Sequence, residues 1–171
     1  MEARIDYLKI VPKDALHALY GLEQSIRKSG LETSLLELVR MRASQMNGCA
    51  FCLDMHSKDA RAEGETEQRL YGLSAWRETP YYTDRERAAL EWTEAVTMIS
   101  RDHAPDEIYE RVRRHFNETE LANLTLAVMA INSWNRLAIA FRVVPGTYQR
   151  RSADGQSVPG QSVPAQSKAA N

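Results

Sequence analysis

Apolar residues recur every three or four positions along most of the chain, which is the spacing of amphipathic helices. The clearest stripe covers residues 35–46 and stops at Asn47-Gly48, a pair that typically ends a helix. Alternation with a period of two, the sign of a strand, never extends beyond a few residues. The pattern predicts an all-α fold, in which one helix ends at this pair and another starts directly after it.

Two further helix starts are marked by capping residues. Thr83 and Glu86 have the spacing of a capping box, and Asn117 and Glu120 have the same spacing. The first pair opens a helix whose predicted buried side consists of Ala88, Ala89, Leu90, Trp92, Ala95, Val96 and Ile99. The second pair opens a long apolar helix that we expect to run to about Phe141.

The composition changes near residue 151. Residues 1–150 carry the helical pattern and suit a single domain that is large enough to fold around its own core. Residues 151–171 repeat the run Gly-Gln-Ser-Val-Pro and contain no aromatic residue and no apolar periodicity. We therefore predict one helical domain followed by a disordered tail.

A weak internal similarity emerges when the sequence is shifted by 85 positions. The shift aligns residues 43–49 with residues 128–134, and it places Trp134 and Leu137 opposite the two cysteines of the chain. This arrangement is typical of a duplicated helical unit in which one copy carries chemistry and the other does not.

The charge balance limits the classes of partner. The chain has 22 basic and 23 acidic side chains, so nothing favours a nucleic acid or an anionic membrane as partner. We expect no membrane-spanning segment, because no stretch approaches the apolar length that one needs, and no signal peptide, because the first residues carry acids and no apolar run. The expected location is the cytoplasm, where a cysteine pair is more often catalytic, redox-sensing or metal-binding than a permanent structural disulfide.

The only two cysteines, Cys49 and Cys52, form a Cys-x-x-Cys pair, and His56 follows four residues later. If the segment after Gly48 is helical, these three side chains stand at i, i+3 and i+7 and share one face. Both cysteines then lie in the first turn of the helix, where unpaired amides and the helix dipole favour a thiolate. His56 can accept the thiol proton. On the residues alone, Cys49 is the more natural attacking sulfur because it lies nearer the helix start.

Other chemistries fit the motif less well. A zinc site needs four ligands, and Cys49, Cys52 and His56 supply at most three, although Glu37 could complete the set. A c-type haem site needs histidine where Leu53 stands. A thioredoxin-type site needs an alternating strand and helix pattern, and both flanks here are helical. Two inert buried cysteines are the plain alternative. We expect neither a metal nor a cofactor.

One family shares this combination of residues. Glu37 lies twelve residues ahead of Cys49, and the run Cys49-x-x-Cys52-x-x-x-His56 comes next, which resembles the signature of the alkylhydroperoxidase AhpD branch of the carboxymuconolactone decarboxylase-like proteins. The resemblance covers residues 12–100 closely and the later helices more loosely. It implies a small all-helical protein that assembles as a homotrimer or homohexamer.

The resemblance also implies roles for the site residues. Cys52 would be oxidised by an organic hydroperoxide or by hydrogen peroxide to a sulfenic acid, and Cys49 would resolve it as a disulfide. His56 and Glu37 would form the proton relay, and a thiol donor, such as a lipoylated protein, would reduce the disulfide. The best-known members have a second histidine where this chain has Phe51, so we expect a shorter relay.

The leading hypothesis is therefore a thiol-dependent hydroperoxide reductase. The alternative is a non-peroxidatic disulfide oxidoreductase or a redox-sensing adaptor, which would react slowly with peroxide and exchange rapidly with a partner disulfide. A structural zinc module is a third hypothesis and predicts bound metal. The cysteine pair argues against a true lactone decarboxylase, which does not depend on one.

Overall fold

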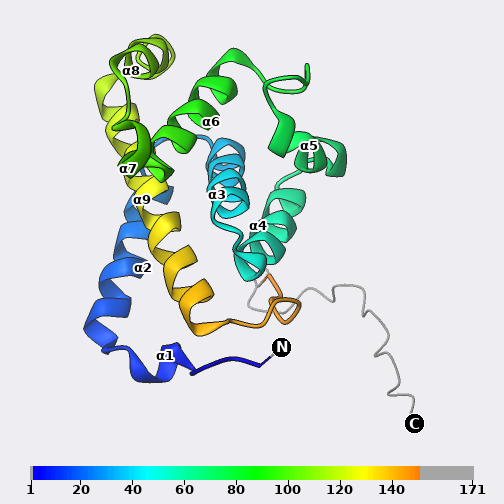
Figure 1. The fold of residues 1–171 in the computed structure, drawn as a ribbon, viewed down its shortest axis with the longest axis vertical. Helices are drawn as coiled ribbons and strands as arrows, with labels where there is room; N and C mark the ends of the chain where they lie inside the picture. The colour runs from blue at the N-terminus through cyan, green and yellow to red at the C-terminus, as the bar shows by residue number, and fades with distance from the viewer. Residues whose placement is uncertain (1, 151–171) are drawn as a thin grey trace.

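The computed structural model describes residues 2–150, so the predicted disordered tail, residues 151–171, lies outside the described residues. The described residues form nine α-helices and one short 3-10 helix, and they contain no strand (Figure 1). In chain order these are α1 (Tyr7–Ile10), α2 (Lys13–Arg27), α3 (Thr33–Asn47), α4 (Ala50–Ala62), α5 (Glu67–Gly72), η1 (Leu73–Ala75), α6 (Asp84–Thr97), α7 (Ile99–Asp102), α8 (Asp106–Val112) and α9 (Glu118–Phe141). The all-α prediction is confirmed.

Helix α3 occupies the centre of the fold, and it packs against α4, α6 and α9 (Figure 1). It is buried nearly all round because the apolar stripe seen in the sequence faces the neighbouring helices. The same helix also buries three polar side chains, Glu37, Arg40 and Ser44. Buried polar groups need partners, so these three mark the part of the core where polar contacts gather.

The break between α3 and α4 falls at the predicted pair. Helix α3 ends at Asn47, and Gly48 follows with φ 69° in the left-handed region, which glycine adopts without strain. The Cys49 N–H then donates to the Ser44 carbonyl at 3.0 Å, which closes the turn. Helix α4 starts at Ala50 with Cys49 as its N-cap residue.

Both predicted capping boxes are present. The Thr83 and Asn117 side chains accept from the backbone N–H of Glu86 and Glu120, and each glutamate accepts in return from the N-cap N–H. One expectation for the first helix is wrong: Ile99 does not lie on its buried side but is 52 % exposed. The reason is that α6 ends at Thr97 and the chain turns before α7, so the helical period is interrupted.

Helix α9 has the length and the apolar composition needed to cross a membrane, and it is the only such helix in residues 2–150. The expectation that no stretch reaches this length is therefore wrong. In the fold, α9 packs against α2, α3, α4 and α6, and it buries the polar side chains of Asn132 and Asn135. Its apolar residues pack against neighbouring helices on several sides, as in the central helix of a bundle.

Candidate active site

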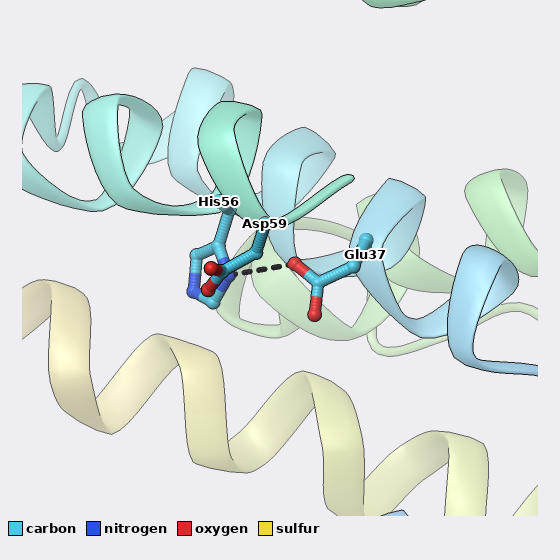
Figure 2. A group of neighbouring side chains, drawn as sticks. All are labelled: Glu37, His56 and Asp59. Carbon is cyan, nitrogen blue, oxygen red and sulfur yellow. Dashed lines mark hydrogen bonds and ion pairs between the residues drawn. The ribbon is translucent and has the colours of Figure 1, made fainter. Parts of the chain in front are cut away.

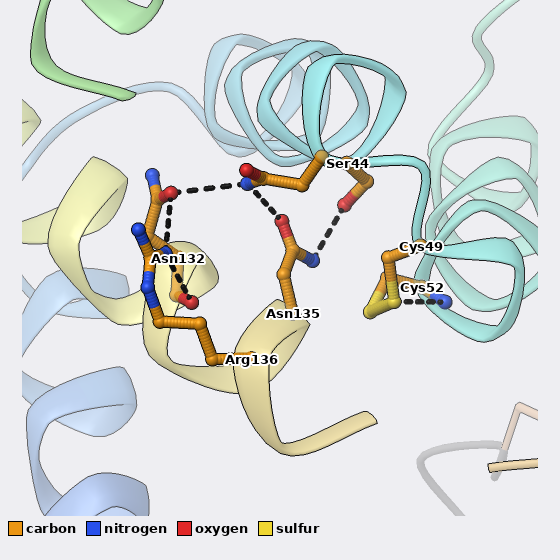
Figure 3. Close-up of a disulfide and its surroundings, with 7 residues drawn as sticks. Ser44, Cys49, Cys52, Asn132, Asn135 and Arg136 are labelled. Atoms are coloured by element: carbon orange, nitrogen blue, oxygen red, sulfur yellow. Dashed lines mark hydrogen bonds between the residues drawn. A yellow bond between two sulfur atoms is a disulfide. The ribbon is translucent and has the colours of Figure 1, made fainter. Parts of the chain in front are cut away.

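Cys49 and Cys52 form a disulfide at the start of α4, with their Cα atoms 5.3 Å apart (Figure 3). The Cys49 Sγ also acts as the helix cap, because it accepts a hydrogen bond from the Cys52 N–H at 3.4 Å. Each cysteine is only 1 % exposed. A sulfur at this position meets the unpaired amides and the positive end of the α4 dipole, which stabilise negative charge on it.

A buried network of amides fixes the turn that carries the disulfide (Figure 3). The Asn47 Nδ2 donates to the side-chain oxygens of Asn132 at 3.0 Å and Asn135 at 2.9 Å. The Asn135 Nδ2 in turn donates to the Ser44 Oγ at 3.1 Å. Because the Ser44 carbonyl accepts the Cys49 N–H, the network ties the N-cap cysteine to α9. Asn135 was not singled out from the sequence, because it has no local partner there.

His56 on α4 and Glu37 on α3 form a buried pair, with the Nδ1 of the imidazole 2.8 Å from the Glu37 Oε2 (Figure 2). Burial alone would raise the pKa of the Glu37 carboxyl, but the hydrogen bond and charge of His56 and the charge of Arg40 outweigh it, and the pKa is lowered. An ionised Glu37 accepts the Nδ1–H, which leaves Nε2 as the nitrogen able to take up a proton.

Arg40 supports this pair from the other side. Its guanidinium donates to the Glu37 Oε1 at 2.6 Å and to the Glu23 Oε2 at 2.8 Å, and the arginine is 3 % exposed. Glu23 also accepts from the Trp134 Nε1 at 3.1 Å. These contacts hold the Glu37 carboxylate in one orientation toward His56. Sequence reasoning missed Glu23, because its contacts connect three helices and leave no local spacing.

Asp59 is a further acid beside His56. It lies three residues later on α4, and its Oδ1 accepts from the Tyr148 hydroxyl at 2.8 Å. Burial, together with the Glu37 charge, raises the pKa of the Asp59 carboxyl, although Tyr148, His56 and Arg150 act in the opposite direction. Burial and the contact with Asp59 also raise the pKa of Tyr148. The i+3 spacing from His56 was the available signal for Asp59, whereas nothing local pointed to Tyr148.

Glu37, His56 and Asp59 each bring one possible metal-binding atom within 4.8 Å of the others (Figure 2). Both oxygens of Glu37 and one oxygen of Asp59 are, however, already engaged by protein donors. Since most of these atoms already have protein partners, the three side chains fit proton transfer better than metal ligation.

A cavity of about 530 Å³ opens beside the disulfide. Its wall contains Cys52 and His56 but, among the described residues, not Cys49. One part of the wall is apolar and aromatic and includes Tyr7, Tyr20, Phe51, Met55 and Trp134, and another part carries the charged side chains of Glu23, Arg27, Arg40 and Asp59. A second, more polar cavity of about 480 Å³ lies on the Glu37 side, and Arg27, Arg40, Asp59 and Tyr148 line both.

The structure therefore brings together the four residues singled out in the sequence. Glu37 contacts His56 directly, His56 and Cys52 share one cavity, and Cys49 is bonded to Cys52. Their catalytic roles stay predictions.

Comparisons with known proteins identify the family of the chain. Residues 13–95 match the model of the carboxymuconolactone decarboxylase family. YdfG, an uncharacterised protein of Bacillus subtilis, is 46 % identical over 140 residues, which cover 82 % of this chain and 95 % of YdfG.

Solved structures share the fold. The crystal structure of an Agrobacterium tumefaciens protein of unknown function, for which an antioxidant defence role as AhpD has been suggested, superposes with a TM-score of 0.82. It is 44 % identical, and the match covers 86 % of this chain and 100 % of that one. The debrominase Bmp8 superposes with a TM-score of 0.68 at 21 % identity, covering 79 % of this chain and 73 % of Bmp8. At that identity only the fold is shared, and one fold can support different reactions.

Proposed function

Because this chain belongs to the carboxymuconolactone decarboxylase family, among its AhpD-like proteins, we propose that it is a thiol-dependent hydroperoxide reductase. One observation carries the proposal: one cysteine of a Cys-x-x-Cys disulfide, Cys52, lines a cavity whose wall also holds the His56 of a buried Glu37–His56 pair. A thiol that is next to a base and open to a cavity is the arrangement expected of a reactive cysteine.

In the proposed reaction, the Cys52 thiol gives its proton to His56 and the thiolate attacks the terminal oxygen of a hydroperoxide. The O–O bond breaks, Cys52 becomes a sulfenic acid, and the leaving alkoxide takes the proton back from His56. Ionised Glu37 stabilises the imidazolium between these two transfers. The presence of Cys52 on the cavity wall favours it over Cys49 as the attacking sulfur.

Cys49 then attacks the sulfur of the Cys52 sulfenic acid, the S–O bond breaks, and hydroxide leaves as water after taking up a proton. The resulting disulfide is the form seen in the structure. The apolar part of the wall suits the body of an organic hydroperoxide. We propose a lipoylated protein as the thiol donor and a homotrimer or homohexamer as the working assembly.

A disulfide oxidoreductase or redox-sensing adaptor is the competing proposal. Phe51 favours it, because an apolar side chain lines the cavity where the best-known relatives have a second histidine for the relay. Reaction with a hydroperoxide separates the two proposals.

The test is the intact mass of the reduced protein before and after one equivalent of cumene hydroperoxide. We expect loss of two hydrogens within seconds in the wild type. We also expect a dimedone-reactive sulfenic acid in Cys49→Ser and no peroxide consumption in Cys52→Ser. A wild-type protein that stays reduced while it rapidly reduces a partner disulfide would favour the competing proposal.

A further inference from the structure

Only one of the two cysteines belongs to the wall of the cavity. Both cysteines belong to one buried apolar cluster with Ala43, Ile131 and Ala138, but of the two only Cys52 also belongs to the wall of the 530 Å³ cavity. A thiol attacks a disulfide along the S–S axis and must therefore reach one sulfur from outside. Among the described residues, the cavity gives such access to Cys52 and not to Cys49.

The other sulfur is the better leaving group. The Cys49 Sγ accepts the Cys52 N–H at 3.4 Å and caps the 13-residue helix α4. These contacts stabilise the thiolate that would form on Cys49 when the bond breaks, and a more stable thiolate leaves faster. Access and leaving-group stability therefore select the same direction of attack.

We propose that the electron donor attacks Cys52, expels Cys49 as a thiolate and forms a mixed disulfide on Cys52. This inference rests on the proposed redox turnover of the pair, and it holds whether the oxidant is a peroxide or a partner disulfide. The helix start that favours a thiolate on Cys49 thus makes Cys49 the leaving group in this step.

The chemistry balances for a dithiol donor. The first donor thiol loses its proton and bonds to Cys52, and the Cys49 thiolate takes up a proton. The second donor thiol loses its proton and attacks the donor's own sulfur in the mixed disulfide, and Cys52 leaves as a thiolate that is reprotonated. The donor departs with an internal disulfide, having given two electrons and two protons to the cysteine pair.

The position of Cys52 restricts the donor. With 1 % of each cysteine exposed, the attacking sulfur must enter the cavity, whose wall also includes the aromatic side chains of Tyr7, Tyr20 and Trp134. A small dithiol, or a dithiol on a flexible arm, suits such an approach better than a dithiol set in the surface of a folded domain. Donor and oxidant then compete for one cavity.

The arrangement can be tested without any peroxide. The oxidised wild-type protein is treated briefly with N-acetylcysteamine, a slender monothiol that cannot resolve its own mixed disulfide. The reaction is quenched with acid, and the released thiol is capped with N-ethylmaleimide. Chymotrypsin cleaves after Phe51 and so separates the two cysteines into different peptides for mass spectrometry.

We expect the monothiol on Cys52 and the maleimide on Cys49, with the opposite pattern at least about tenfold rarer. Predominant labelling of Cys49 by the monothiol, or an intact disulfide that no slender thiol opens, would overturn the inference. Failure of the peroxidase proposal would instead show as absence of reaction with hydroperoxide, while this labelling pattern stays the same.

A matched pair of variants gives a second measurement. Cys49→Ser and Cys52→Ser each keep one cysteine, and their folding is compared by thermal unfolding. We expect the remaining thiol of Cys49→Ser to react with 2,2′-dithiodipyridine about tenfold faster than that of Cys52→Ser, because of the two only Cys52 belongs to the cavity wall. Equal rates, or a faster Cys52→Ser protein, would contradict the assignment.

Discussion

Replacing Glu37 by glutamine tests whether the buried acid acts in proton transfer or only in folding. The carboxylate has two partners, the Arg40 guanidinium at 2.6 Å and the His56 Nδ1 at 2.8 Å, and the residue is 6 % exposed. Glutamine has nearly the same shape, but it offers only one acceptor oxygen. Its amide group must therefore face either the guanidinium or the imidazole N–H, and one contact is lost.

The size of the effect on stability can be worked out from these contacts. Removing one member of a buried ion pair costs about 3–5 kcal/mol when the other member is left alone. Arg40 keeps its contact with Glu23 at 2.8 Å, so we expect a loss of about 2–3 kcal/mol. For a domain of this size, that loss lowers Tm by roughly 5–10 °C. Loss of the relay carboxylate should in addition slow Cys52 oxidation by about a hundredfold.

Glu23→Gln is the matched control. It also removes one carboxylate from Arg40, but Glu23 has no contact with His56 among the described residues. We expect Glu23→Gln to lose about 1–2 kcal/mol of stability and to keep the wild-type shape of the pH profile for thiol oxidation. The assays are thermal unfolding and stopped-flow measurement of disulfide formation after addition of an organic hydroperoxide between pH 5 and 9.

The pH dependence of the free energy of unfolding tests whether Glu37 stabilises the fold in its ionised form. The pKa of Glu37 is lowered from its usual value of 4.5, so its contribution to stability is full above that pH and is lost as the pH falls through the folded-state pKa. The difference in stability between wild type and Glu37→Gln should therefore narrow in acid. If the two glutamine variants slowed thiol oxidation equally at every pH, Glu37 would be a structural partner of Arg40 and no part of a relay.

Three other substitutions test separate features. Asp59→Asn keeps an acceptor for the Tyr148 hydroxyl but removes a negative charge beside His56. The imidazolium that stabilises the Cys52 thiolate is then less stable, so the pH at which Cys52 reacts with iodoacetamide should rise, as measured by alkylation rates. Asn135→Ala leaves buried polar partners unpaired and should lower the free energy of unfolding by about 2–4 kcal/mol in urea titration. Thr83→Ala removes a capping box and should lose about 1 kcal/mol with little change in activity.

Local signals in the sequence predicted the parts of the site that depend on neighbouring residues. The break at Gly48, the two capping boxes and the spacing from Cys49 to His56 all involve positions within one or two helical turns, and the structure contains the break and both boxes. Asp59 belongs to the same class, since it shares a face of α4 with His56, and it could have been found from spacing alone.

The contacts that orient the site could not be predicted in this way. Glu23 reaches Arg40 from α2, across 17 positions, and Tyr148 reaches Asp59 across 89 positions. Such pairs depend on how the helices pack, and residues so far apart in the sequence form no spacing pattern that would predict their contact. The choice between the two cysteines had the same difficulty, because helix position pointed to Cys49, whereas the cavity wall contains Cys52.

The internal similarity at an offset of 85 residues has a counterpart in the fold. The first residues of α3 and α9 differ by this offset, and Asn47 donates to Asn132, its equivalent 85 positions later, at 3.0 Å. Equivalent residues that contact each other are expected when two related helices cross about a pseudo-twofold axis. The duplication itself stays a prediction, and the two asparagines are its point of contact in the fold.

The two copies differ in the residue that comes directly after these asparagines. Gly48 ends α3 in a left-handed turn, whereas Ser133 continues α9 as an unbroken helix. Inside a continuous helix, each N–H is already bonded to a carbonyl four residues earlier, so a side chain at position 134 finds no free amide. Only the broken copy frees the Cys52 N–H to hold the Cys49 sulfur. The Gly48 turn, which ends α3, is therefore what gives α4 a free N-terminal amide to hold the Cys49 sulfur.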